Sequence, residues 1–173
     1  MIDKGNAADI VDFRQRLVAW FHQYQRPLPW RERYRPYEVW ISEIMGQQTQ
    51  MERVTHYFRR WVERFPDVPA VAQAPEQAIL KAWEGLGYYS RARNIQQAAR
   101  QLVEAGETEI PNDYEQLRAL PGIGPYTARA IASIAFGQSV PAIDGNVKRV
   151  ASRIYGLREN INQPTVIRGI RLA

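Results

Sequence analysis

The run Leu-Pro-Gly-Ile-Gly-Pro at residues 120–125 constrains the fold of this chain more than any other feature of its sequence. Glycine and proline are concentrated there, between two segments in which apolar residues recur every three or four positions. That spacing is typical of amphipathic helices. Gly122 and Gly124 can adopt backbone conformations closed to other residues, and without a Cβ they allow a partner to approach the main chain. The run therefore predicts two helices, about 112–119 and 125–136, joined by a tight turn.

Helical periodicity covers nearly the whole chain, and no convincing strand pair, repeat or low-complexity segment interrupts it. Further helices are predicted at about 7–24, from Tyr37 to Gln48, at about 50–64, after Pro75, at about 89–105 and at about 145–155. No helix is predicted between the FPDVP segment that ends the third helix and Pro75, nor in the tail NINQPTVIRGIRLA. The expected fold class is all-α.

Composition excludes several classes of protein. The 173 residues suit one ordinary domain, and a hydrophobic content of 45% with 24% charged residues is that of a soluble globular protein. The chain has no cysteine, so it can form no disulfide and offers no thiolate to zinc or to an iron–sulfur cluster. No apolar run is long enough to span a bilayer, and the N-terminus lacks the apolar core of a signal peptide. We therefore expect a cytoplasmic protein without a membrane partner.

The charge balance points to a polyanionic partner. The formal net charge is +5, and the basic residues are 20 arginines and only 3 lysines. Arginine suits bidentate contacts with phosphate. The N–H groups that begin the helix after the turn form an anion site, which Thr127 and Arg129 support. A Gly-x-Gly turn alone favours a simpler interpretation, a helix–helix turn with Ile123 in the core, but the full run in a basic chain favours phosphate binding.

Four segments resemble a known family. The hairpin LPGIGPYTA is similar to the helix-hairpin-helix of the DNA glycosylase superfamily that includes endonuclease III, and PAIDGNVKRV (141–150) resembles the segment that carries the catalytic aspartate there. WISEIMGQQTQMERV (40–54) and WEGLGYYSRARN (83–94) narrow the resemblance to the MutY-type adenine DNA glycosylases, which remove adenine mispaired with 8-oxoguanine. The resemblance covers about residues 8–160.

The resemblance implies a domain organisation and a partner. Residues 29–137 would form a six-helix barrel that contains the helix-hairpin-helix at 112–136. Residues 1–28 would form an N-terminal helix packed on a second helical half, of which 138–173 is the start. The expected partner is double-stranded DNA with A·8-oxoguanine or A·G mispairs, bound by a monomer, and the expected location is bacterial-type cytoplasm, associated with the nucleoid.

The chain departs from the family pattern in its C-terminal part. The family continues with more helices, four cysteines that bind a 4Fe–4S cluster and a domain that reads 8-oxoguanine. The chain thus resembles a member truncated at its C-terminus, with no cofactor encoded and no metal site. The apolar faces of the first and last helices, with Phe13, Leu17 and Phe21, are expected to lack a partner, which would reduce stability and discrimination of the opposite base.

Two carboxylates are the candidate catalytic groups. Asp144 precedes a helix, and its position alone indicates an N-cap; a capping carboxylate stays ionised near neutral pH. The resemblance gives Asp144 an electrostatic or nucleophilic role at the deoxyribose C1′, supported by Asn146. Glu43 lies off the apolar stripe of its helix and on position alone is a solvated carboxylate, although a pocket beside Val39 and Gly46 would raise its pKa. The resemblance makes Glu43 the general acid that protonates adenine at N7.

The family has a larger apolar residue at the position of Gly46. We expect the loss of that side chain to loosen the adenine pocket.

Other residues are candidates for contact with DNA or with the bases. Tyr88 suits a wedge between bases, or equally a helix-capping aromatic. The DNA-contact set implied by the resemblance is Trp30, Arg31, Gln48, Thr49, Leu86, Tyr88, Gly122, Gly124 and Thr127.

Tyr126 distinguishes two branches of the superfamily. Endonuclease III-type enzymes, which also cut the strand, have a lysine at this hairpin position, whereas tyrosine forms no Schiff base with a sugar aldehyde. The resemblance therefore implies a monofunctional enzyme that leaves an abasic site, with the Tyr126 hydroxyl positioning Asp144. Two alternatives stay open: a bifunctional endonuclease III-type glycosylase and lyase, and an inactive DNA-binding helix-hairpin-helix fragment. Lys148, one turn past Asp144, also leaves open an incidental slow lyase reaction.

Overall fold

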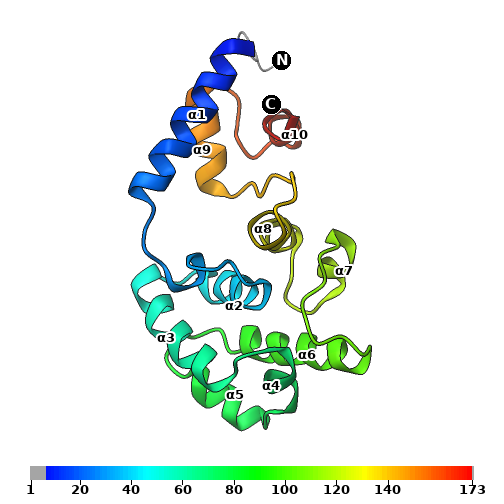
Figure 1. The fold of residues 1–173 in the computed structure, drawn as a ribbon. Helices are drawn as coiled ribbons and strands as arrows, with labels where there is room; N and C mark the ends of the chain where they lie inside the picture. The colour runs from blue at the N-terminus through cyan, green and yellow to red at the C-terminus, as the bar shows by residue number, and fades with distance from the viewer. Residues whose placement is uncertain (1–6, 173) are drawn as a thin grey trace. The chain divides into compact units, whose positions relative to one another are not determined.

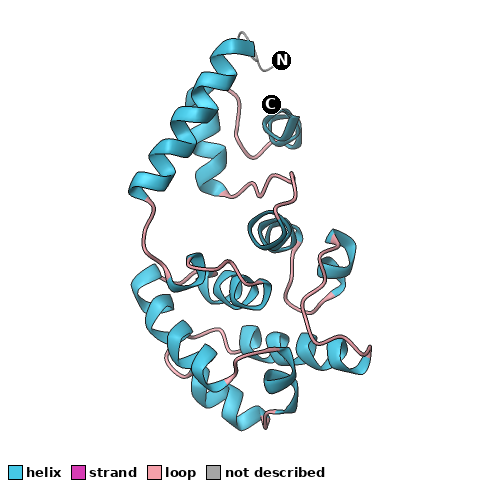
Figure 2. Ribbon diagram, viewed as in Figure 1, coloured by secondary structure: helices cyan, strands magenta, loops and turns pink. Residues whose placement is uncertain are grey.

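The computed structural model describes residues 7–172, and all regular secondary structure in that range is helical (Figures 1 and 2). The chain divides into two compact units. One is Leu28–Ala142, and the other consists of the part up to Pro27 together with the part from Ile143 onward. These divisions lie near the predicted boundaries at 28/29 and 137/138.

The Leu28–Ala142 unit is built around α2. Its elements are η1 (Pro29–Arg31), α2 (Pro36–Gly46), α3 (Met51–Arg64), α4 (Val68–Gln73), α5 (Glu76–Trp83), α6 (Ser90–Glu104), α7 (Tyr114–Ala119) and α8 (Pro125–Phe136). Helix α2 packs against α3, α6 and α8, while α6 also packs against α4 and α5. Trp40, Trp61 and Trp83 are fully buried in the single core that results. Figure 1 shows α4, α5 and α6 at one end of this unit.

The second unit contains α1 (Ala7–Tyr24), α9 (Gly145–Ile154) and α10 (Pro164–Leu172). Helix α10 packs against α9, with Val166 and Ile170 buried. In contrast, no residue of α9 is buried, and most of the described side chains of α1 are exposed. This unit is therefore less well packed than the other.

Most helices lie where the periodicity predicts them, but two expectations were wrong. Residues 68–73 form α4, which begins after Asp67; the Asp67 carboxylate accepts a hydrogen bond from the Ala70 N–H at 2.8 Å. A six-residue helix is too short to show a periodic pattern, and Pro69 within it, with Pro66 and Pro75 on either side, suggests a loop. The tail forms α10, which begins at Pro164 and buries Val166 and Ile170, four residues apart.

Smaller differences concern the ends of elements. Helix α2 ends at Gly46, so Gln48 lies outside the helix and is exposed. Helix α7 has Asp113 as its N-cap, which accepts from the Gln116 N–H at 2.9 Å. Among residues 7–172, no helix is both long and apolar enough to cross a bilayer.

Candidate functional site

The hairpin between α7 and α8 uses its two glycines differently. Gly122 has a φ of +79°, and a Cβ there would lie 2.8 Å from the Asn94 Cβ on α6. The fold itself therefore requires glycine at 122. Gly124 has an ordinary φ of −82°, and a Cβ there would have open space around it. The prediction of a special backbone conformation was wrong for Gly124, whose missing side chain leaves the start of α8 accessible.

The first turn of α8 presents the N-terminal end of a helix. Gly124 is the N-cap, Pro125 follows, and the first N–H groups of a helix have no partner within it. Thr127 as a whole residue is 4% exposed, so little of it is accessible to a phosphate in this structure. Tyr126 is 41% exposed. The turn itself is packed by Leu120 and Ile123, as the simpler interpretation expected.

Arg129 stabilises the hairpin from within. Its guanidinium carbon lies 4.8 Å from the centre of the Tyr114 ring, and Nη1 donates to the Pro125 carbonyl at 3.2 Å. The cation therefore joins α7 to α8. This contact gives Arg129 a structural role beside the predicted support of phosphate binding.

Asp144 is held in one orientation at the start of α9. Oδ1 accepts from the Val147 N–H at 2.7 Å, and Oδ2 accepts from the Asn146 side-chain amide at 3.1 Å. Asn146 in turn accepts from Arg149 Nη2 at 2.8 Å. The predicted N-cap is confirmed, and Asn146 supports the carboxylate directly. Lys148, one turn further on, donates to Asn162 at 3.1 Å.

Glu43 lies on a helix that is buried on almost every side. It is half-buried itself, while Val39 and Met45 on the same helix are inaccessible. An added Cβ on Gly46 would lie 3.3 Å from Met51 Cε, so the flexible end of Met51 occupies part of the space that a larger residue would use. Glu43 and Tyr126 belong to the Leu28–Ala142 unit, whereas Asp144 and Asn146 belong to the other.

Trp30 contributes to the core. It is 7% exposed, and its ring meets the Phe58 ring edge to face with centroids 5.0 Å apart. The neighbouring Arg31 ends η1 and is half-buried. Any contact of Trp30 with a base would therefore involve only the small part of the residue that is exposed.

Two short loops carry most of the other predicted DNA contacts. Gln48 and Thr49 lie in residues 47–50, and Leu86 and Tyr88 lie in residues 84–89. Gln48 and Tyr88 both adopt the left-handed backbone conformation, with φ of +56° and +48°. Such a conformation costs a non-glycine residue about 1–3 kcal/mol and persists only where the surroundings impose it. Tyr88 is 63% exposed, whereas Leu86 is buried.

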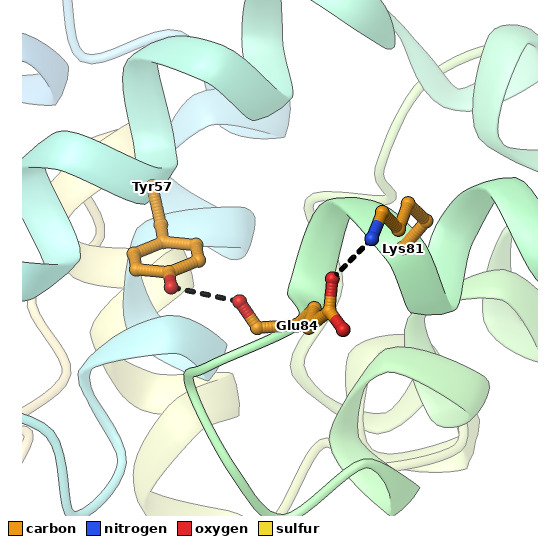
Figure 3. A network of polar contacts seen from close by, with 3 residues as sticks. All are labelled: Tyr57, Lys81 and Glu84. Carbon is orange, nitrogen blue, oxygen red and sulfur yellow. Dashed lines mark hydrogen bonds and ion pairs between the residues drawn. The ribbon is translucent and has the colours of Figure 1, made fainter.

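Residues 84–89 are held from α3 and α5. The Tyr57 hydroxyl donates to the Glu84 carbonyl at 2.7 Å (Figure 3). Trp83 Nε1 donates to the Gly87 carbonyl at 3.0 Å. A Cβ on Gly85 would collide with the Tyr57 hydroxyl. Lys81 also pairs with the Glu84 carboxylate at 2.6 Å; this bond raises the pKa of Lys81 and lowers that of Glu84. Because both side chains are exposed, the pair adds little stability.

Arg91, which the sequence reasoning missed, joins the two loops. Its Nη1 donates to the carbonyls of Ile44, Met45 and Gln47 at 3.0, 3.0 and 2.7 Å. Its Nη2 donates to the carbonyls of Leu86 and Gly87, both at 3.2 Å. Both nitrogens lie 3.4 Å from Thr49 Oγ1.

Arg91 is a buried cation with backbone partners. It is 7% exposed, and this desolvation lowers the pKa of its guanidinium. The last carbonyls of α2 carry the negative end of the helix dipole and stabilise a cation there. A signal was present in the sequence, because Arg91 occupies the apolar stripe of α6 in register with Ile95, Ala98 and Leu102.

The described residues offer no site for a metal cofactor. Among residues 7–172 there is no group of three or more histidines and carboxylates that could hold a metal ion. An iron–sulfur cluster needs thiolate ligands, and the sequence contains no cysteine. The residues of this chain therefore do not fit a 4Fe–4S cluster.

The fold and the hairpin define a class of DNA repair protein. Residues 41–170 match the family described as HhH-GPD superfamily base excision DNA repair protein. Among solved structures, a thermostable thymine-DNA glycosylase is similar in fold, with a TM-score of 0.82 and 23% identity over 96% of this chain and 80% of that one. A non-covalent endonuclease III–DNA complex has a TM-score of 0.73 and 26% identity, over 90% and 73%.

Curated relatives are more similar in sequence. Adenine DNA glycosylase of Rattus norvegicus is 45% identical over 88% of this chain and 31% of its own length. The enzymes of Buchnera aphidicola (strain Bp) and Mycobacterium tuberculosis (strain H37Rv) are 44% and 40% identical, over 87% and 88% of this chain. The chain belongs to the HhH-GPD superfamily of base excision DNA repair proteins, and it spans between 31% and 50% of the length of these relatives.

Proposed function

We propose that this chain is an adenine DNA glycosylase that hydrolyses the N-glycosidic bond of adenine mispaired with 8-oxoguanine or guanine. The observation that carries the proposal is the 40–45% identity to curated adenine DNA glycosylases over nearly nine-tenths of the chain. The matched region includes both candidate catalytic carboxylates, Glu43 and Asp144. The substrate is double-stranded DNA, bound by a monomer in the cytoplasm.

The chemistry follows from the two carboxylates. Adenine is a poor leaving group until it is protonated, so Glu43 donates a proton to N7. The glycosidic bond to C1′ then breaks through an oxocarbenium-like state, which an adjacent anion stabilises. Water adds to C1′ and loses a proton, so the products are free adenine and an abasic sugar with a C1′ hydroxyl. Asp144 supplies that anion, and its bonds from Val147 and Asn146 keep it from reorienting. The adenine must first leave the base stack, at a cost of a few kcal/mol.

Because position 126 holds a tyrosine and not a lysine, the proposed reaction is monofunctional. A strand-cutting enzyme needs an amine that forms a Schiff base with the sugar aldehyde, and a phenol cannot do so. The product is then an abasic site.

Single-turnover base release from a duplex with one A·8-oxoguanine pair tests the proposal. Alkali-dependent cleavage at that adenine is expected for the parent chain and should fall at least about 10²-fold in Glu43→Gln, which cannot donate a proton as an acid. Glu104→Gln, at the end of α6, is the control with unchanged activity. No release by the parent chain, with salt-sensitive DNA binding intact, would leave only a DNA-binding module.

Borohydride trapping distinguishes the proposed monofunctional enzyme from the bifunctional alternative. A monofunctional enzyme gives no covalent adduct with DNA, whereas a lyase traps through a lysine. If an adduct forms and disappears in Lys148→Gln, the monofunctional assignment is wrong.

A further inference from the structure

We propose that Arg91 is a positioning residue that fixes Gln48 and Tyr88 relative to each other and thereby sets the discrimination of mispaired from fully paired DNA. The proposal rests on the proposed function, in which Gln48 and Tyr88 contact the duplex at the mispair. Arg91 itself is buried and does not need to touch DNA.

The geometry places one guanidinium between two loops that are far apart in sequence. Nη1 faces the carbonyls at the end of α2 and of Gln47, and Nη2 faces the carbonyls of Leu86 and Gly87. Because the guanidinium is planar and rigid, fixing one nitrogen fixes the other. The Arg91 guanidinium therefore fixes the position of each of the two loops relative to the other.

The backbone conformations supply the second argument. Gln48 directly follows one acceptor, and Tyr88 directly follows another. Both residues have positive φ, which is unfavourable for side chains of this kind. Hydrogen bonds to the preceding carbonyls restrict each peptide plane and oppose relaxation to an ordinary conformation. Arg91 thus stabilises both strained residues at once.

Arg91 also contacts two aromatic rings, one in the core and one at the surface. Its guanidinium carbon lies 5.2 Å from the centre of the Trp83 ring and 5.6 Å from that of the Tyr88 ring. Trp83 is fully buried, whereas Tyr88 is largely exposed. The cation therefore connects the core to the exposed ring that would enter the duplex.

Arg91→Lys and Arg91→Met test the proposal, with Arg100→Met as the matched control. Lysine keeps the charge but cannot serve both loops with a rigid fork. Arg100 lies on the same helix and also donates to a backbone carbonyl, that of Ala72 at 3.2 Å, but it contacts neither loop. If the methionine variant fails to fold, the lysine variant still decides the question.

The first readout does not depend on activity. Hydrogen exchange of the Thr49 and Leu86 amides, which bond to Gly46 and Trp83, should become about tenfold faster in Arg91→Lys. The Ala128 amide in α8 should be unchanged. Equal acceleration at all three amides would mean general destabilisation and would overturn the proposal.

The second readout is discrimination between duplexes. In Arg91→Lys, the concentration of A·8-oxoguanine duplex that gives half-maximal base release should rise about tenfold, with the saturating rate within about threefold of the parent. Affinity for the fully paired duplex should stay within about twofold. Equal weakening for both duplexes, or a lower saturating rate with unchanged half-saturation, would refute the positioning role.

The outcomes separate this inference from the proposed function. If the parent chain releases no adenine, the proposed function fails, and direct binding of the two duplexes replaces the kinetic assay. A parent chain that binds both duplexes equally would overturn the inference itself, because Arg91 would then have no discrimination to set.

Discussion

At the scale of single residues, the two hairpin glycines serve different purposes: one is required by the fold, and the other leaves room for a partner. The fold requires glycine at position 122, because its positive φ and its close approach to Asn94 exclude any side chain. At Gly124 neither a positive φ nor a close neighbour excludes a side chain, so nothing within the chain explains why this residue is glycine. A partner whose surface approaches the main chain at the start of α8 would explain it.

Alanine at each glycine should separate these purposes. Gly122→Ala is expected to lower the free energy of unfolding by about 1–3 kcal/mol, because it adds both strain and a clash with Asn94. Gly124→Ala should leave stability within about 0.5 kcal/mol yet weaken binding to any DNA duplex. Urea unfolding and fluorescence-anisotropy titrations at fixed salt measure both quantities. Unchanged DNA binding by Gly124→Ala would remove the hairpin from the interface.

At the scale of elements, a buried tyrosine joins α2 to the end of α3. The Tyr37 hydroxyl donates to the Phe65 carbonyl at 2.5 Å and accepts from Trp61 Nε1 at 3.0 Å. Burial raises the pKa of this phenol well above its ordinary value of 10.0. The hydroxyl therefore stays protonated in the folded chain at a pH where it ionises in the unfolded chain.

This raised pKa predicts a specific alkaline weakness. The contribution of the Tyr37 hydroxyl is complete below pH 10 and is lost as pH rises above 10 toward the raised pKa. Tyr37→Phe should cost about 1–2 kcal/mol at pH 8, because it leaves the Trp61 N–H unsatisfied, and the difference from the parent should shrink by pH 11. Urea unfolding across this range measures it, with exposed Tyr24→Phe as control. A constant difference would contradict the assignment.

At the scale of the whole molecule, the two units differ in how completely they bury apolar side chains. The Leu28–Ala142 unit has a continuous core. In the other unit, large apolar side chains of α1 and α9 are exposed by 41% or more: Val11, Phe13, Leu17, Val18, Trp20, Tyr24, Val147, Val150 and Ile154. Most helical stability comes from packing of the apolar face, so α1 and α9 lack much of theirs.

Hydrogen exchange should show this difference directly. Amides in α1 and α9 are expected to exchange at least about 100-fold faster than those of α2 and α6, because they open at a lower free energy. Mass spectrometry of the intact chain after pulse labelling measures both sets. As a matched substitution, Trp20→Gln on the exposed face should leave the midpoint of thermal unfolding unchanged. Equally slow exchange in α1 and α2 would show that the expected loss of stability is wrong.

The sequence by itself determined the features that depend on neighbours along the chain. Helix periodicity placed α1 and α8, turn chemistry placed the hairpin, and the position before a helix gave the N-cap at Asp144, because each needs only residues within a few positions. The motifs also indicated the family to which the chain belongs.

Only the tertiary structure decided which residues meet across long separations. Arg91 binds the end of α2 at Ile44, 47 positions away, and Gly122 needs its glycine because Asn94 approaches it from α6. Local propensity shows Arg91 as another basic residue on a helix, and it predicts a special backbone conformation at Gly122 but not the approach of Asn94. Long-range packing made one a buried junction between two loops and the other a steric necessity, because these contacts form only when α2, α6 and the hairpin share one core.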